Sequence, residues 1–311
     1  MANGKIGVLV MSYGTPESMD GIEEYYTHIR RGHAPTPEQL AGLTERYEAI
    51  VGGVFPLREN TNRQVAGLQA ALDAAAPGQF GCYQGLKHAR PYIEDGVAAM
   101  AADGIKQAVA IVLAPHYSTM SVGSYMKRAK EKAEELGIAV AEVESYHAHP
   151  KLIEALATRV KTAYAALEAA GAQPIKTLFS AHSLPVKIRE MNDPYEQQLL
   201  ESSALVAEGA GVTDWAFTWQ SAGRTREPWL GPDILETMKE TAEAGYKGVL
   251  AAPIGFVSEH LEVLYDLDIE AQAEAGKLGI KLKRMDMLGT DPLYMETLAD
   301  SVRDAARAAF I

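Results

Sequence analysis

The hydrophobic and polar positions of this chain form two kinds of segment. Short, nearly continuous apolar runs predict strands that are buried on both faces, as in a parallel sheet. Longer segments with apolar residues three and four positions apart predict amphipathic helices. The predicted strands cover residues 5–10, 79–84, 108–113, 138–143, 175–181, 214–218 and 247–252. The predicted helices cover 18–31, 37–50, 59–76, 91–102, 121–136, a long segment after Pro150, 195–209 and 232–244.

The alternation of these segments predicts an α/β fold. Strands that alternate with helices of such lengths form parallel sheets through right-handed crossover connections. The 311 residues exceed the roughly 150 that one domain commonly has. We therefore expect two similar α/β halves whose strand ends face a shared cleft, where ligands of open α/β sheets bind.

Composition narrows the classes of protein that this chain can represent. The 41 acidic and 29 basic residues give a net charge of −12, which argues against a nucleic-acid partner. We find neither a signal-peptide pattern nor an apolar stretch near the ~20 residues of a membrane span. A single cysteine, Cys82, excludes an internal disulfide and a cysteine-ligated iron–sulfur cluster. We expect a cytoplasmic protein that is not integral to a membrane.

The first candidate for chemistry is His182, with Ser183 beside it. The strand over 175–181 must end before Pro185, because proline cannot donate a hydrogen bond to a sheet. His182 then lies at the carboxyl end of a strand, where a neutral imidazole can accept a proton or bind a divalent metal. The alternative is a strand-end histidine that forms a hydrogen bond with a loop carbonyl.

A second candidate is a series of carboxylates at Glu262, Asp266 and Glu270. A spacing of four residues places all three on one face of a predicted helix, with Ser258 as its N-cap. This face is either exposed to water or compensated by a cation. We expect Glu262 to be the most buried of the three, and a carboxylate near an imidazole suits a divalent ion.

Basic and tyrosine side chains form a third group. Arginine binds carboxylates through two hydrogen bonds, and tyrosine offers a flat contact surface with a polar tip. If they converge, they suit a large planar ligand with carboxylate arms; taken singly, each is an ordinary surface residue. The group consists of Arg30, Arg31, Arg46, Lys87, Tyr13, Tyr47, Tyr117 and Tyr125.

Several long motifs resemble those of the ferrochelatase family, and together they cover nearly the whole chain. The signature segment is Leu178-Phe179-Ser180-Ala181-His182-Ser183-Leu184-Pro185, followed by Asn192-Asp193-Pro194-Tyr195. The other motifs are Tyr13-Gly14-Thr15-Pro16, Tyr25 to Gly32, Arg46-Tyr47, Gly85-Leu86-Lys87-His88, Leu113 to Ser118, Trp219-Gln220-Ser221, Pro228 to Pro232, Gly255-Phe256 and His260 to Asp266. The chain is most similar to the soluble, monomeric coproporphyrin ferrochelatases of Gram-positive bacteria.

The resemblance implies insertion of Fe²⁺ into a porphyrin held between two Rossmann-like domains. The domains would be residues 1–150 and 151–290, with a helix at about 291–311 packed on the first. By position, His182 and Glu262 would be catalytic and face the metal, and Asp266 and Glu270 would be secondary metal residues. Tyr13 would be catalytic from the opposite face of the porphyrin. Arg30, Arg46, Tyr47 and Tyr125 would contact the porphyrin with it.

The implied substrates are coproporphyrin III and Fe²⁺, with no permanently bound cofactor. The alternatives are a protoporphyrin IX ferrochelatase, a cobalt-type tetrapyrrole chelatase and a non-enzymatic porphyrin or haem carrier. Two residues depart from the family pattern. Asn192 replaces a glycine, and we expect the turn to survive because asparagine tolerates a left-handed conformation. Phe55 replaces a serine, which removes a polar contact to a porphyrin arm.

Overall fold

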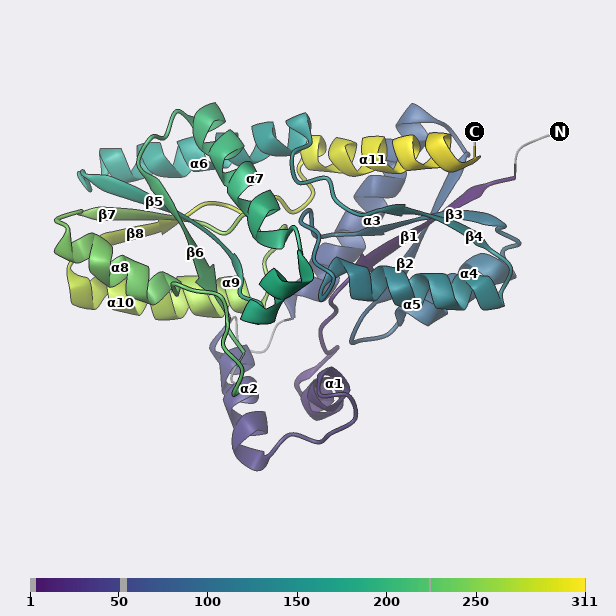
Figure 1. The fold of residues 1–311 in the computed structure, drawn as a ribbon, viewed down its shortest axis with the longest axis horizontal. Helices are drawn as coiled ribbons and strands as arrows, with labels where there is room; N and C mark the ends of the chain where they lie inside the picture. The colour runs from purple at the N-terminus through teal and green to yellow at the C-terminus, as the bar shows by residue number, and fades with distance from the viewer. Residues whose placement is uncertain (1–3, 51–54, 224, 311) are drawn as a thin grey trace. The chain divides into compact units, whose positions relative to one another are not determined.

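The computed structural model describes residues 4–50, 55–223 and 225–310. The chain forms two compact units, the first comprising Met1–Tyr146 with Gly289–Ile311 and the second His147–Leu288. Each unit is a four-stranded parallel sheet with helices on both faces (Figure 1). The predicted α/β class with two similar Rossmann-like halves is therefore confirmed. The division into domains at residues 1–150 and 151–290 stays a prediction, because it concerns which parts of the chain fold independently.

The first unit has the strand order β2-β1-β3-β4. Its strands are β1 (Ile6–Ser12), β2 (Phe80–Leu86), β3 (Gln107–Val112) and β4 (Ala139–Val143). All seven residues of β1 are buried, because this central strand has a neighbour on each side and helices on both faces. The apolar run that predicted this strand thus reflects its place in the middle of the sheet.

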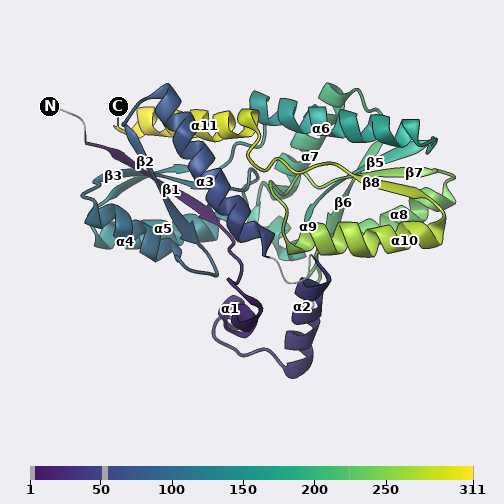
Figure 2. The same cartoon turned by 180° about the vertical axis from the view of Figure 1, so that it is seen from behind.

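Helices cover the first sheet from two sides. One face packs against α3 (Pro56–Ala75) and the C-terminal helix α11 (Pro292–Phe310), which also contact each other (Figure 2). The other face packs against α4 (Ile93–Ala102) and α5 (Val122–Glu135). Two further helices, α1 (Ile22–Ile29) and α2 (Pro37–Ala49), pack on each other away from the sheet, and a capping box at Thr36 starts α2.

The second unit repeats this topology with the strand order β6-β5-β7-β8. Its strands are β5 (Ile175–His182), β6 (Trp215–Gln220), β7 (Gly248–Ala252) and β8 (Lys281–Arg284). One face is covered by α6 (Pro150–Ala169) and α7 (Tyr195–Ala210), the other by α8 (Ile234–Glu243) and α10 (Gln272–Leu278). In each sheet, the strand that comes first in the chain therefore lies between the strands that come second and third.

The structure corrects the sequence analysis at two elements of the second unit. The edge strand β8 was not predicted, because three of its four residues are lysine or arginine and only Leu282 is apolar. The predicted acidic helix is broken into α9 (Leu261–Tyr265), a π-helical turn (Asp266–Ala271) and α10. Its N-cap is His260 and not Ser258.

Asn192 confirms the expectation for the altered turn. It lies at the end of a short 3₁₀ helix, Val186–Met191, with φ 51° and ψ 38°. This is the left-handed region that glycine enters freely and that asparagine tolerates better than most residues. Asn192 therefore adopts the left-handed turn conformation that the sequence analysis expected of it.

Two expectations from composition also bear on the described residues. None of the helices within 4–50, 55–223 and 225–310 has both the length and the apolar character needed to cross a membrane. Cys82, the single cysteine of the chain, is a free thiol in β2.

Candidate functional site

The strand order places a candidate site residue at the same point of each sheet. The chain winds outward in opposite directions from β1 and from β5, because the second and third strands of each unit lie on opposite sides of the first. Ligands of α/β proteins bind at such switch points, beyond the carboxyl ends of the strands. Tyr13 directly follows β1, and His182 is the last residue of β5.

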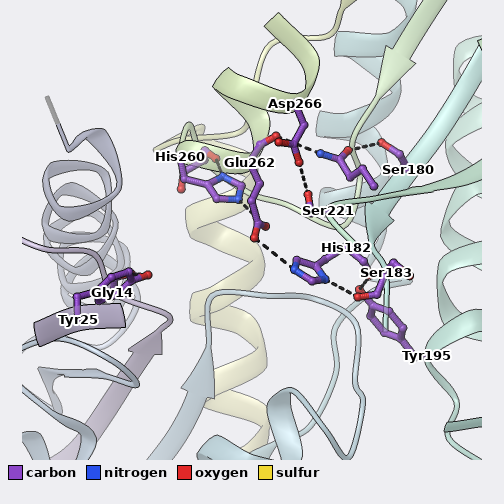
Figure 3. A network of polar contacts seen from close by, with 12 residues as sticks. Gly14, Tyr25, Ser180, His182, Ser183, Tyr195, Ser221, His260, Glu262 and Asp266 are labelled. Atoms are coloured by element: carbon purple, nitrogen blue, oxygen red, sulfur yellow. Dashed lines mark hydrogen bonds and ion pairs between the residues drawn. The ribbon is translucent and has the colours of Figure 1, made fainter. Parts of the chain in front are cut away.

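Both ring nitrogens of His182 face oxygen atoms that can only accept hydrogen bonds. Nε2 lies 3.3 Å from Oε1 of Glu262, and Nδ1 contacts the backbone carbonyl of Ser183 (Figure 3). An imidazole that donates from both nitrogens carries a positive charge. The side chains of His182 and Glu262 are 34% and 30% exposed, so ions can reach this His182–Glu262 pair.

The protonation of the His182–Glu262 pair follows from its mutual attraction. Burial works to lower the pKa of His182, but the negative charge of Glu262 and the hydrogen bonds to Glu262 and Ser183 raise it to about 9. Burial works to raise the pKa of Glu262, but the charge of His182 holds it well below its usual range. At neutral pH the pair is an imidazolium and a carboxylate. The neutral imidazole considered from sequence is therefore not the resting form of His182, and the role of this residue toward proton and metal stays a prediction.

Glu262 has a second histidine on its other oxygen. Nε2 of His260 lies 3.5 Å from Oε2 of Glu262, while Nδ1 of His260 donates to the carbonyl oxygen of Ser258 at 3.1 Å. Figure 3 shows His260, Glu262 and His182 in a row, with the carboxylate between the two imidazoles. Glu262 is therefore held from both sides, although it sits in a helix of only five residues.

The other two acids of the predicted series have different surroundings. Asp266 is only 6% exposed, and its Oδ2 accepts a hydrogen bond from the hydroxyl of Ser221. Glu270 is exposed. In the π-helical turn hydrogen bonds span five residues, so side chains four positions apart no longer stack as in an α-helix. The expectation of one acidic face, with Glu262 as its most buried member, is wrong: Asp266 is the buried acid.

The His182–Glu262 pair offers a metal only a small ligand set. Across the described residues no group of three or more histidine, cysteine, aspartate or glutamate side chains has the geometry to hold a metal ion. An imidazole nitrogen and a carboxylate oxygen still suit a borderline divalent cation. Two ligands hold such an ion less firmly than a closed structural site with four.

In the first unit, Tyr13 is 42% exposed and its ring centre lies 4.7 Å from that of His88. Nδ1 of His88 lies 3.0 Å from Nδ1 of His28, so one ring donates to the other. Burial, with the charge of Lys87 next, lowers the pKa of His88 to about 3. His88 is therefore a neutral ring beside the exposed phenol at neutral pH.

The predicted porphyrin-contacting residues of the first unit fall into two groups. Arg30 and Arg46 are partly exposed, and Nε of Arg30 donates to the carbonyl oxygen of His33 at 3.1 Å. Tyr47 and Tyr125 are each only 4% exposed. The hydroxyl of Tyr47 bonds to Thr15 at 3.1 Å, and Tyr125 belongs to a hydrophobic core of this unit. The contacts of these four residues with a porphyrin stay a prediction.

Other members of the predicted group of basic and tyrosine side chains also have partners within the first unit. Nζ of Lys87 donates to Ser124 at 2.7 Å and lies 4.7 Å from the ring centre of Tyr125. Burial, with Arg128 and Arg31 next, lowers the pKa of Lys87 to about 8. Phe55 packs on Tyr47, with 4.8 Å between the ring centres. Arg31 is exposed, and Tyr117 is partly buried.

Sequence reasoning missed three residues that contact the candidate acids or Tyr13. His260 contacts Glu262, Ser221 contacts Asp266, and His88 packs on Tyr13. All three lie in motifs that carry the family resemblance, which was the signal that could have found them. Ser183, flagged beside His182, is fully buried and donates to the carbonyl oxygen of Leu230 at 2.8 Å, so its role is structural.

Comparison with known proteins agrees with these motifs. A family model described as Ferrochelatase matches residues 5–306. The coproporphyrin III ferrochelatase of Bacillus subtilis (strain 168) is 48% identical over 305 residues, which are 97% of this chain and 98% of that protein. The enzyme of the same name from Oceanobacillus iheyensis is 47% identical over 310 residues, 99% of each chain.

A solved structure with a similar fold is that of the sirohydrochlorin chelatase SirB from Bacillus subtilis subspecies spizizenii in complex with cobalt. It aligns with a TM-score of 0.59 at 11% sequence identity and covers 98% of this chain and 97% of its own. At this identity the likeness concerns the fold alone. The family match over nearly the whole chain decides the matter: this protein belongs to the ferrochelatase family.

Proposed function

We propose that this enzyme inserts Fe²⁺ into coproporphyrin III and releases two protons, as a step of haem biosynthesis. The observation that carries the mechanism is the 3.3 Å contact between His182 and Glu262 at the end of β5. The substrate is supported by whole-length relatives named coproporphyrin III ferrochelatases at 46–48% identity. Fe²⁺ is a substrate here.

The His182–Glu262 pair can hold either one proton or one divalent cation. In the resting pair the proton lies on His182 and balances the charge of Glu262. An approaching Fe²⁺ would repel the imidazolium and displace its proton to water, which would leave a neutral imidazole and a carboxylate with a net charge of −1. Each of the two pyrrole N–H groups must lose a proton as iron enters. Once the iron has left His182 for the porphyrin, the neutral imidazole can accept one of these protons as a general base, and the other goes to water. Exchange of proton for metal is the chemistry that the reaction requires.

The first unit would supply the contacts to the substrate. We propose that Tyr13 approaches the macrocycle from the face opposite to the metal, since it is the exposed residue after β1. Arg30 and Arg46, which are partly exposed, would bind propionate arms, with the exposed Arg31 as a further cation. Tyr47 and Tyr125, both buried, would support these contacts from within the unit. Four propionates need more cationic partners than two.

We also propose that the enzyme acts as a cytoplasmic monomer without a resident cofactor. A single cysteine cannot ligate an iron–sulfur cluster, which takes three or four protein ligands of this kind in most proteins. Sedimentation velocity of the purified protein tests whether it is a monomer, and metal analysis tests whether it carries a resident metal cofactor.

Substrate preference tests the proposed function. One additional charge-assisted hydrogen bond contributes about 1.5–3 kcal/mol, so coproporphyrin III should exceed protoporphyrin IX by about tenfold or more in kcat/KM. The assay uses both porphyrins with Fe²⁺, Zn²⁺ and Co²⁺ under anaerobic conditions and in identical detergent. Equal values, or a preference for protoporphyrin IX, would overturn the substrate. A marked preference for Co²⁺ would indicate a cobalt chelatase, and binding without turnover would indicate a carrier.

Replacement of His182 should separate porphyrin binding from metal insertion. A general base contributes about 10²–10⁴-fold to a rate, so His182→Ala should lower kcat by at least about 100-fold. The Kd for coproporphyrin III, measured by fluorescence quenching, should stay within about tenfold, since His182 is not among the side chains proposed to bind the propionate arms. His147→Ala is the matched control, because His147 faces Glu201 at 3.0 Å in the same unit. Turnover near that of wild type in His182→Ala would rule out its role.

Replacement of Glu262, Asp266 and Glu270 should lower kcat to different extents, because the three carboxylates have different surroundings. Glu262→Gln removes the charge that faces His182, and we expect a loss in kcat comparable with that of His182→Ala. Glu270→Gln should stay near the wild-type rate because this side chain is exposed. Asp266→Asn should lie between them, since Asp266 is buried and raises the pKa of His182 from a distance. Steady-state kinetics of the three variants decide, and three equally small effects would contradict the assignment.

The titration of His182 should depend on Glu262. Because the charge of Glu262 raises the pKa of His182 to about 9, the neutral base becomes available as pH rises toward that value. The insertion rate should therefore increase from neutral to alkaline pH. In Glu262→Gln burial dominates, so the midpoint of His182, followed by NMR of its ring in the free enzyme, should move to lower pH. A midpoint that does not change in this variant would show that the pair is not coupled.

A further inference from the structure

The backbone of Gln220 lies beside His182 at the end of the second sheet. It is the last residue of β6 and the register partner of His182 on β5. Its carbonyl oxygen accepts a hydrogen bond from the backbone N–H of Ser183 at 2.8 Å. The residue is 1% exposed, so its side chain is enclosed by the surrounding protein.

The side chain of Gln220 completes the link to Glu262. Its Oε1 accepts a hydrogen bond from the hydroxyl of Ser180 at 2.9 Å, and its Nε2 donates to the backbone carbonyl of Glu262 at 3.2 Å. A carbonyl only accepts, so the amide nitrogen has to face Glu262 and the amide has one satisfactory orientation. The side chain thus spans from β5 to α9.

Ser221, the residue after Gln220, contacts the π-helical turn through its side chain. Ser221 has φ 59°, an uncommon conformation for a residue other than glycine, and its hydroxyl donates to Asp266. Strained residues persist only where the surrounding structure fixes them, and they concentrate at functional sites. The end of β6 and the residue after it therefore contact both Glu262 and Asp266, which lie on a five-residue helix and on the π-helical turn that follows it.

We propose that Gln220 is a positioning residue that holds Glu262 at the separation from His182 at which the pair binds a divalent metal. This inference rests on the proposed function for its biological meaning. Partners that orient metal ligands alter metal affinity when they are removed, commonly by about 10–100-fold. A side chain that only fills the core would alter stability alone.

The test compares Gln220→Met with Ser203→Ala. Methionine keeps the length and volume of glutamine but loses both hydrogen bonds. Ser203 is fully buried in the same unit and donates to the carbonyl oxygen of Leu199 at 2.7 Å, away from the pair, so its variant controls for the loss of a buried hydrogen bond. The measurements are the Kd for Zn²⁺ of the free enzyme by calorimetry, the KM for Fe²⁺, the Kd for coproporphyrin III and the unfolding temperature.

We expect Gln220→Met to raise the Zn²⁺ Kd and the Fe²⁺ KM by about 10–100-fold, with no change in porphyrin Kd beyond that of Ser203→Ala. Unchanged metal constants, or the same change in both variants, would overturn the proposal. If Gln220→Met fails to fold, Ser180→Ala decides, because it removes only the anchor on β5 and should give a smaller rise. The Zn²⁺ Kd needs no porphyrin, so a wild-type enzyme that inserts no iron would refute the proposed function without affecting this comparison.

Discussion

The contact between His182 and Glu262 is the interaction on which the rest of the site depends. Each group alone would be costly to keep charged where it is, since burial favours the neutral form of both. Together they stay charged because each lowers the cost of the other. Removal of either partner leaves burial to favour the neutral form of the other. We propose that an entering cation can take the place of the proton. The proposed binding of metal by exchange for a proton suits an enzyme that has to release what it binds.

Most of the fold could be predicted because burial on both faces of a strand leaves a local signature. β1, β3 and β7 are runs of buried residues, and each was visible in the sequence. β8 was missed because an edge strand is paired on one side only and needs no such run. The π-helical turn was missed for a different reason, since α and π turns accept the same residue types and differ only in hydrogen-bond span.

The candidate site was predictable in its central members, His182 and Glu262, but not in its arrangement. No periodicity relates His182 to Glu262, which are far apart along the chain, and the family resemblance alone brought them together. The contacts made by Gln220 and His260 depend on how loops meet at the end of a sheet, which single-residue patterns do not encode. The proton on His182 could not be predicted either, because a pKa depends on the distance to a charge.

Because of the π-helical turn between α9 and α10, the position of Asp266 depends on the number of residues in this segment. A π turn holds one residue more per hydrogen-bonded ring than an α turn, so a deletion of one residue within Asp266–Ala271 could restore a regular helix. That helix would be the better local structure, yet it would rotate the preceding turn relative to α10, which is anchored on α8 and β8. Asp266 would then leave Ser221. Natural variation in this segment should therefore preserve residue count more strictly than residue identity.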